Sequence, residues 1–174
     1  KEAQNTFDPL LGATRLIKPE DAKALNDAAN TTRTLASTYD PERGVYGALG
    51  LGAVKHENDA VTQTSQILQK YPQITQTLQQ VGPQAVQMAG SLRRQLEQLE
   101  RDEKAATAAV TMPNRTEHLE RLDQQIKVKR EQLMPWETVE AAFNTPESPN
   151  AMKALFTLDK RMNKSLAFNE TRRV

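Results

Sequence analysis

The two histidines are the residues of this chain best suited to metal binding, and neither has a second histidine at a ligand spacing. His56 is followed by Glu57, and His118 follows Glu117. A zinc site needs three or four ligands that come together in space, commonly with two histidines a few residues apart. Acidic neighbours of a lone histidine are ordinary on a charged helix surface. We therefore predict no metal site, and the chain has no cysteine to supply thiolate ligands.

A pair of carboxylates beside the single tryptophan is the second candidate for chemistry. Glu137 and Glu140 lie three residues apart next to Trp136, and acid pairs near aromatic rings occur in glycoside hydrolases. Both glutamates would lie on one face of one helix, however, and aromatic residues make up only 5% of the chain. Glu137 also suits the first turn of a helix, where the helix dipole favours an acid. We predict that the protein is not an enzyme and holds no cofactor.

Four of the seven glycines lie in the apolar segment 44–54. Their spacing matches neither a dinucleotide-binding nor a phosphate-binding loop. Because each glycine costs a helix about 1 kcal/mol relative to alanine, the segment is predicted to be a loop. Two hypotheses remain for it: a buried connection between helices, or a contact device that docks on a partner or transiently touches a membrane. It is far shorter than the roughly 20 residues that span a bilayer.

Basic residues are spread along the chain and are largely cancelled by acids, so that the net charge is only +1. The region Lys153–Arg173 is the exception, since basic residues outnumber acids there. Such a region could bind phosphates with release of counterions. It has no motif that reads a DNA groove, so a nucleic-acid-associated helical adaptor is an alternative hypothesis only.

The composition favours an all-α protein. Hydrophobic residues are 37% of the 174 residues and aromatic residues are scarce, so a core must be built from Ala, Leu, Ile, Val and Met, which suits helix–helix packing. We predict a helical bundle with a long antiparallel coiled-coil hairpin and an extended N-terminal arm. The chain starts with Lys rather than Met, as expected of a processed product or of part of a longer protein.

Proline and glycine divide the chain into four predicted regions. Residues 1–17 form an arm, because Pro9 and Gly12 interrupt its apolar residues. Residues 18–82 form a helical region that contains the Gly-rich loop 44–54, with helices over about 19–40 and 57–71. Gly82 and Pro83 are predicted to stop this region.

The hairpin is predicted over residues 83–134. Apolar residues recur there at alternating steps of four and three, which is a heptad pattern held over both halves. The first half is expected to reach Val110, and Pro113 marks the connection between two antiparallel helices. Residues 135–174 follow: a corner at Pro135, a short helix over 136–143, and a last helix with Ser148 as its N-cap before a basic tail.

These features together favour a non-catalytic structural subunit of a larger assembly that uses helix faces as contacts. A homo-oligomer or a multi-subunit complex is expected. Two settings suit such a subunit: a phage virion, as an internal, connector or ejection component, or the bacterial envelope, as a minor pilus-like part of a secretion or conjugation machine. The predicted contact residues are apolar members of the helical stripes and of the Gly-rich loop: Leu25, Leu35, Leu49, Leu51, Leu92, Leu96, Leu99, Leu119, Leu122, Ile126 and Leu133.

Overall fold

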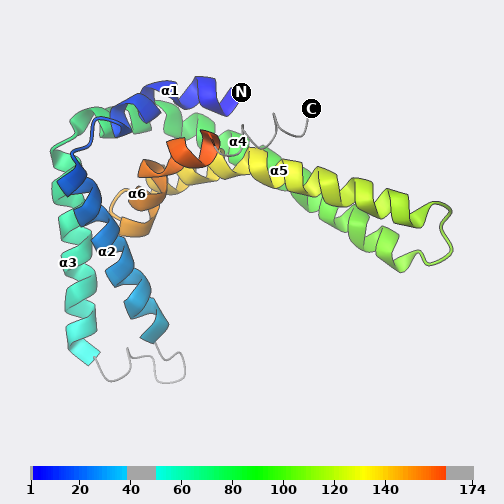
Figure 1. The fold of residues 1–174 in the computed structure, drawn as a ribbon, viewed down its shortest axis with the longest axis horizontal. Helices are drawn as coiled ribbons and strands as arrows, with labels where there is room; N and C mark the ends of the chain where they lie inside the picture. The colour runs from blue at the N-terminus through cyan, green and yellow to red at the C-terminus, as the bar shows by residue number, and fades with distance from the viewer. Residues whose placement is uncertain (1, 39–49, 164–174) are drawn as a thin grey trace.

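The computed structural model describes residues 2–38 and 50–163, and describes side chains for residues 2–31 and 58–163. Over these ranges the chain is helical with no strand (Figure 1). A further helical segment starts at Leu158 and continues to the last described residue. The helices are α1 (Glu2–Thr14), α2 (Pro19–Thr38), α3 (Gly50–Gln69), α4 (Pro72–Ala108), α5 (Arg115–Asn144) and α6 (Pro149–Phe156).

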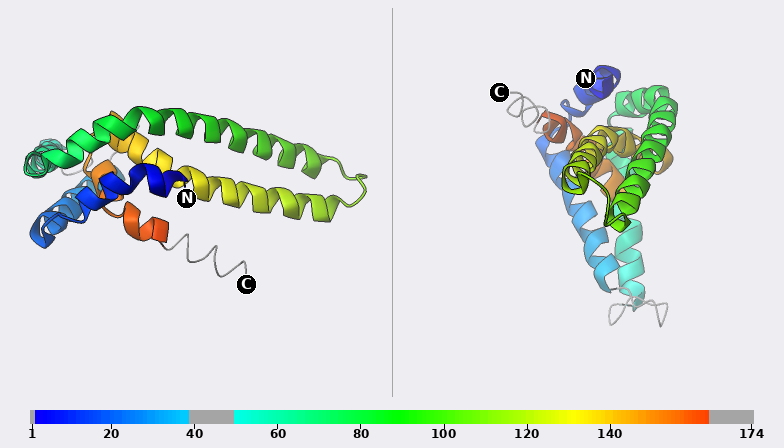
Figure 2. Two further views of the ribbon diagram at one scale, coloured as in Figure 1. Left: turned by 90° about the horizontal axis from the view of Figure 1, so that it is seen from above. Right: turned by 90° about the vertical axis from the view of Figure 1, so that its right-hand side faces the viewer.

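Two helical arms extend from one shared core. Helices α4 and α5 form an antiparallel hairpin whose far half projects away from all other helices, whereas α2 and α3 pair to form the second arm (Figure 1). Helices α1 and α6 pack where the arms meet (Figure 2). The main hydrophobic core ends on the hairpin at Leu92 and Leu133, so the outer part of the hairpin is stabilised by its own seam alone.

The predicted hairpin is confirmed, and its helices are longer than predicted. The first helix starts at Pro72 instead of Pro83, and the second continues past Pro135 to Asn144. Each internal proline removes one backbone hydrogen bond. Helical residues on both sides of each proline are buried, so tertiary packing outweighs that loss. These are Ile74, Leu78, Ala85 and Ala89 around Pro83, and Leu133, Trp136 and Val139 around Pro135.

Polar contacts across the hairpin set the alignment of its two helices. The Nζ atom of Lys129 donates to Oε1 of Gln95 at 2.8 Å, and a guanidinium nitrogen of Arg130 lies 3.3 Å from Oε1 of Glu100. At the hairpin turn, Asn114 adopts a left-handed conformation with φ of 57°. The neighbouring Arg115 then reaches back to the carbonyl oxygens of residues 106 and 107 at the end of α4. Arg115 thereby gives a partner to the carbonyl of Thr107, of the kind that a helix end leaves unpaired. It is a second donor to the carbonyl of Ala106, which also accepts from the backbone N–H of Ala109.

The N-terminal arm is a helix, which corrects the prediction of an extended segment. Helix α1 buries Phe7, Leu10 and Leu11 on one face. Their spacing of three and four residues is that of an amphipathic helix. Pro9, which suggested a break, points its exposed side chain away from the core. Burial of the apolar face therefore stabilises a helix that local signals disfavour.

The predicted Gly-rich loop is wrong over its second half, because α3 starts at Gly50 and residues 50–54 are helical. The glycine content of the segment predicts that this helix starts only at about residue 57. Helix α3 pairs with α2 (Figure 1), and a partner helix stabilises a helix that would be marginal in isolation. Residues 44–49 lie outside the described part of the chain.

The C-terminal helices differ from the prediction in two places. Ser148 is the N-cap of α6, as predicted, and its Oγ accepts a hydrogen bond of 3.3 Å from the backbone N–H of Ala151. The predicted corner at Pro135 and separate helix over 136–143 are wrong, since these residues belong to α5. The helix that begins at Pro149 is interrupted at Thr157 before the next helical segment begins.

Candidate functional site

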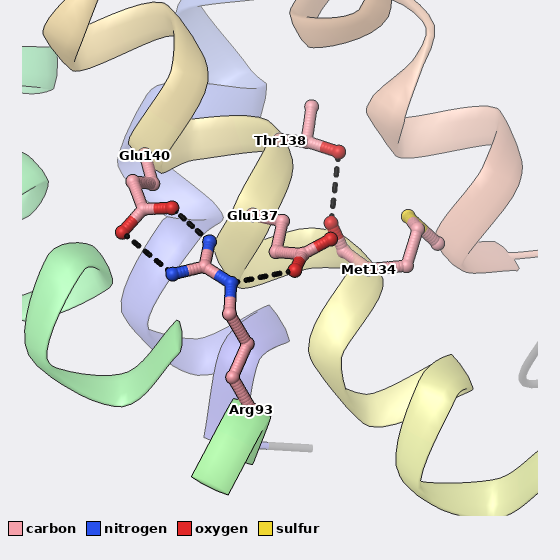
Figure 3. A network of polar contacts seen from close by, with 5 residues as sticks. All are labelled: Arg93, Met134, Glu137, Thr138 and Glu140. Carbon is pink, nitrogen blue, oxygen red and sulfur yellow. Dashed lines mark hydrogen bonds and ion pairs between the residues drawn. The ribbon is translucent and has the colours of Figure 1, made fainter. Parts of the chain in front are cut away.

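The two glutamates considered for catalysis are bound by an arginine from the facing helix (Figure 3). Arg93 of α4 donates from Nε to Oε1 of Glu137 at 2.9 Å, and both of its terminal nitrogens reach the carboxylate of Glu140. The hydrogen bonds to Glu140 raise the pKa of the Arg93 guanidinium most, and the hydrogen bond to Glu137 raises it further. Arg93 therefore stays charged. Both carboxylates are thus occupied by one cation, an arrangement that joins α4 to α5 and leaves no free acid–base pair.

The two glutamates that contact Arg93 differ in how much of their side chains is exposed to solvent. Glu140 has 15% of its side-chain surface exposed, compared with 45% for Glu137. The bidentate contact with Glu140 is therefore the stronger part of the cluster, because ion pairs gain strength as solvent screening falls. Sequence spacing could place the glutamates on one face, but it could not identify Arg93, which lies more than forty residues away.

His118 does not belong to a metal site among the described residues. His118 lies in the first turns of α5, in the projecting half of the hairpin, and the side chain of His56 is outside the described set. No group of three or more acidic, histidine or cysteine side chains is close enough to hold a metal ion within the described ranges. Likewise, no helix that the structure describes is long and apolar enough to cross a membrane.

Of the eight predicted contact residues whose side chains are described, five pack inside the chain itself. Leu25 is buried, as are four residues at or along the hairpin: Leu92, Leu122, Ile126 and Leu133. Leu96, Leu99 and Leu119 are only partly buried, so these three keep surface that another chain can contact. The side chains of Leu35, Leu49 and Leu51 lie outside the described set.

The hairpin tip, residues 109–114, exposes apolar side chains that the sequence patterns did not single out as a contact. Val110 is 77% exposed and Met112 is 36% exposed. Val110 was expected to be the last residue of the heptad stripe, but α4 ends at Ala108 and Val110 lies in the turn. A signal was present in the sequence: a turn between two solvated helices is usually polar, whereas this one carries a valine, a methionine and a proline.

An open groove lies at the base of the hairpin, between α5, the connection to α6, and the helices that follow. Its volume is about 630 Å³. The apolar part of its lining includes Leu96, Leu133 and Met134, and its charged side chains are Arg130, Glu137 and Arg161. We call it the α5–α6 groove. Two of these charged side chains have ion-pair partners, since Arg130 pairs with Glu100 and Glu137 pairs with Arg93.

The basic C-terminal region is only partly described. Lys153 lies near Asn30 of α2, at 3.4 Å from its side-chain oxygen, and residues 164–173 fall outside the described ranges. Of the remaining basic residues of this region, the structure describes Lys160 and Arg161.

Comparison of this chain with protein families, with characterised proteins and with solved structures gives no match.

Proposed function

We propose that this protein is a non-catalytic assembly subunit that contacts other protein chains through its projecting hairpin. The observation that carries the proposal is the hairpin tip, where Val110 and Met112 are exposed at the end of an arm whose outer half projects away from the other described helices. Exposed apolar side chains grouped at one place commonly mark a site of interaction.

The remaining features are consistent with this role. The only acidic pair considered for catalysis is bound by Arg93. The partly buried Leu96, Leu99 and Leu119 extend apolar surface along the hairpin. A virion component or a part of a bacterial secretion machine would use such an arm in the same way, and both settings belong to the proposal.

Light scattering across a range of protein concentrations tests the proposal. We expect the mean mass to rise with concentration, or a discrete oligomer to form, because the exposed apolar surface favours association. A mass that stays at that of one chain, at every concentration up to the solubility limit, would contradict self-assembly.

A further inference from the structure

We propose that a second copy of this chain packs on an uncharged, glutamine-lined face of α4, with the two α4 helices antiparallel across a two-fold axis. This face lies in the first half of α4, at the opposite end of the helix from the hairpin tip, so the inference goes beyond the tip contact. Three observations support it: the absence of charge along this part of α4, side-chain amides that no described residue pairs, and a glutamine spacing that is symmetric about one residue.

The first half of α4 carries no charge. Residues 71–92 contain no Lys, Arg, Asp or Glu, which is the longest such run in a chain that is 26% charged. Exposed glutamines follow one face of the helix there, at successive steps of three, four, four and three residues. We call them the glutamine face: Gln73, Gln76, Gln80, Gln84 and Gln87. The centre of a protein interface is depleted of charged residues relative to the rest of the surface, so this face has the composition of an interface.

The glutamine face is open in the described part of the chain. The buried residues of α4 lie on the opposite side of the helix, where α5 and α1 pack, and α4 runs along one edge of the molecule (Figure 2). None of the five side-chain amides makes a hydrogen bond with a described residue. On the flanks of the face, Val81 and Met88 are only partly buried, and nothing lies within 4 Å of a Cβ atom built on Gly90. A partner helix therefore has room to approach.

Glutamine side chains are complementary to one another. Each amide has two N–H donors and an oxygen that accepts hydrogen bonds, so one glutamine can pair with another, whereas two identical charged side chains repel. In a two-fold dimer the same surface patch meets itself. A face that carries amides and no charge therefore suits a second copy of this chain.

The spacing of the glutamines is symmetric about Gln80. Gln76 and Gln84 lie four residues from it on either side, and Gln73 and Gln87 lie seven residues from it. When two α4 helices pack antiparallel with Gln80 on the two-fold axis, Gln76 meets Gln84 of the second copy, and Gln73 meets Gln87. Every glutamine of the face then has a glutamine partner. A parallel pair needs no such symmetry, so the spacing favours the antiparallel arrangement.

The glutamines align the two copies more than they stabilise the dimer, because amide hydrogen bonds replace hydrogen bonds to water and add little net free energy. Val81 follows Gln80 directly, and its partly exposed side chain approaches Val81 of the second copy. Burial of Val81 supplies the hydrophobic part of the association. One pair of helices is a small interface, so we expect a dimer that dissociates on dilution.

Cysteine cross-linking tests the pairing directly, since the chain has no cysteine of its own. Gln80→Cys should form a disulfide-linked dimer under mild oxidation, because position 80 lies on the two-fold axis. Gln73→Cys alone should stay monomeric, since the two copies of position 73 lie about 21 Å apart along the helices and a disulfide joins Cα atoms at most about 7 Å apart. An equimolar mixture of Gln73→Cys and Gln87→Cys should cross-link.

Gln124→Cys, at an exposed position of α5, measures cross-linking by random collision. Gln80→Cys that cross-links no faster than this control would overturn the dimer. Gln73→Cys that cross-links alone as fast as Gln80→Cys would overturn the antiparallel arrangement.

Charged substitutions test the same contact by sedimentation. Gln76→Lys/Gln84→Lys should weaken self-association by at least about tenfold, because the introduced lysines meet across the dimer. Gln76→Glu/Gln84→Lys should associate like wild type or more tightly, since opposite charges then meet. Gln124→Lys/Gln132→Lys, with the same spacing at exposed positions of α5, is the matched control and should associate like wild type. Glutamine, glutamate and lysine have similar helix propensities, so circular dichroism should show equal helicity for all of them.

A variant of the hairpin tip separates this inference from the proposed function. Val110→Asp/Met112→Ser keeps the glutamine face and should still form the α4 dimer. A tip variant that is monomeric, together with a Gln76→Lys/Gln84→Lys variant that associates like wild type, would overturn the α4 dimer and leave the tip contact standing. The opposite pair of results supports the α4 dimer. A wild type that is monomeric at every concentration overturns the dimer and the self-assembly expected of the tip.

Discussion

Gly82 shows how a single residue sets the approach of two helices. It is buried in α4 opposite Phe143 of α5. A Cβ atom built on Gly82 would overlap the Phe143 ring near its attachment point, where the ring has little freedom to move. The glycine that suggested a helix end is therefore needed inside the helix, because it makes room for an aromatic ring of the partner helix.

Gly82→Ala should destabilise the protein by about 1–3 kcal/mol, as expected for overpacking of a well-packed contact. Thermal or denaturant unfolding measures the change. Gly90→Ala in the same helix is the control, since nothing lies within 4 Å of its added Cβ; it should be neutral or stabilise by about 0.5–1 kcal/mol. Equal effects of the two substitutions would show that the close contact is absent.

Asp21 and Tyr71 join the start of α2 to the junction between α3 and α4. The Tyr71 hydroxyl donates to Oδ2 of Asp21 at 2.6 Å and accepts from the backbone N–H of Lys18 at 3.0 Å, while Lys70 lies 3.2 Å from the same carboxylate. The hydrogen bond from Tyr71 lowers the pKa of Asp21 most, and the contact with Lys70 lowers it further. Together they outweigh the effect of burial, which raises this pKa. The same hydrogen bond raises the pKa of Tyr71.

These shifts predict a loss of stability at both ends of the pH range. A carboxyl group whose pKa is lowered by folding stabilises the fold at pH values above its ordinary pKa of about 4. This contribution is lost as the pH falls through the lowered pKa. A tyrosine with a raised pKa stabilises the fold below about pH 10, and this contribution is lost as the pH rises through the raised pKa.

Melting temperatures of wild type and Tyr71→Phe, measured between about pH 2 and about pH 11, test this. The variant should be less stable at neutral pH, and the difference should narrow below about pH 4 and above about pH 10. A difference that is constant across the range would mean that the hydrogen bond is not formed.

At the scale of elements, the outer half of the hairpin depends on a two-helix seam with no third layer. Ala106, Leu122 and Ile126 are buried there and lie outside the main core cluster. The outer seam therefore has less packing to absorb a substitution than the base of the hairpin, where α1 contacts α4 and α5, and α6 contacts α5.

Leu122→Asp should destabilise the hairpin by at least about 3 kcal/mol, because it removes a buried leucine and places a charge in an apolar seam. Leu96→Asp should cost less, since Leu96 is only partly buried. Circular dichroism and hydrogen exchange measure the loss of helix. Val128→Asp, on an exposed face of α5, is the control and should change stability by less than about 0.5 kcal/mol. Unchanged helicity and melting of Leu122→Asp would contradict the seam.

At the scale of the whole molecule, the two ends of the described chain meet at the base of the hairpin. The Phe7 ring lies 4.8 Å from the Trp136 ring, centroid to centroid, in an edge-to-face arrangement with an interplanar angle of 63°. Arg15 forms a bidentate contact with Asp159 at 2.8 and 3.0 Å. Helix α1 thereby connects both hairpin helices with the C-terminal helical segment and completes the shared core.

Phe7→Ala should destabilise the protein by about 3–5 kcal/mol, since a fully buried aromatic side chain is removed. Trp136 is the single tryptophan and is buried, so its emission should shift to longer wavelength when α1 no longer covers it. Leu16→Ala, at an exposed position after α1, should change neither property. A Phe7→Ala variant with wild-type emission and stability would show that α1 does not dock on α5.

The sequence by itself determined the all-α class, the hairpin and its turn, and the Ser148 cap. Each of these depends on signals within a few turns of helix: scarce aromatic residues, a heptad spacing that resumes after Pro113, and an N-cap followed by proline. Several residues of the seam, such as Leu92, Leu122, Ile126 and Leu133, could be selected for the same reason, because a helical period assigns them to one face.

Only the tertiary structure decided where the helices end and which distant groups meet. Pro83, Pro135 and the glycines at positions 50 and 52 are local helix breakers, each costing about 1–3 kcal/mol, and all lie inside helices here. Packing with partner helices offsets those costs. That packing comes from residues far along the chain, as does the pairing of Arg93 with Glu137 and Glu140. A local pattern contains no information about such partners, because the chain must fold before they become neighbours.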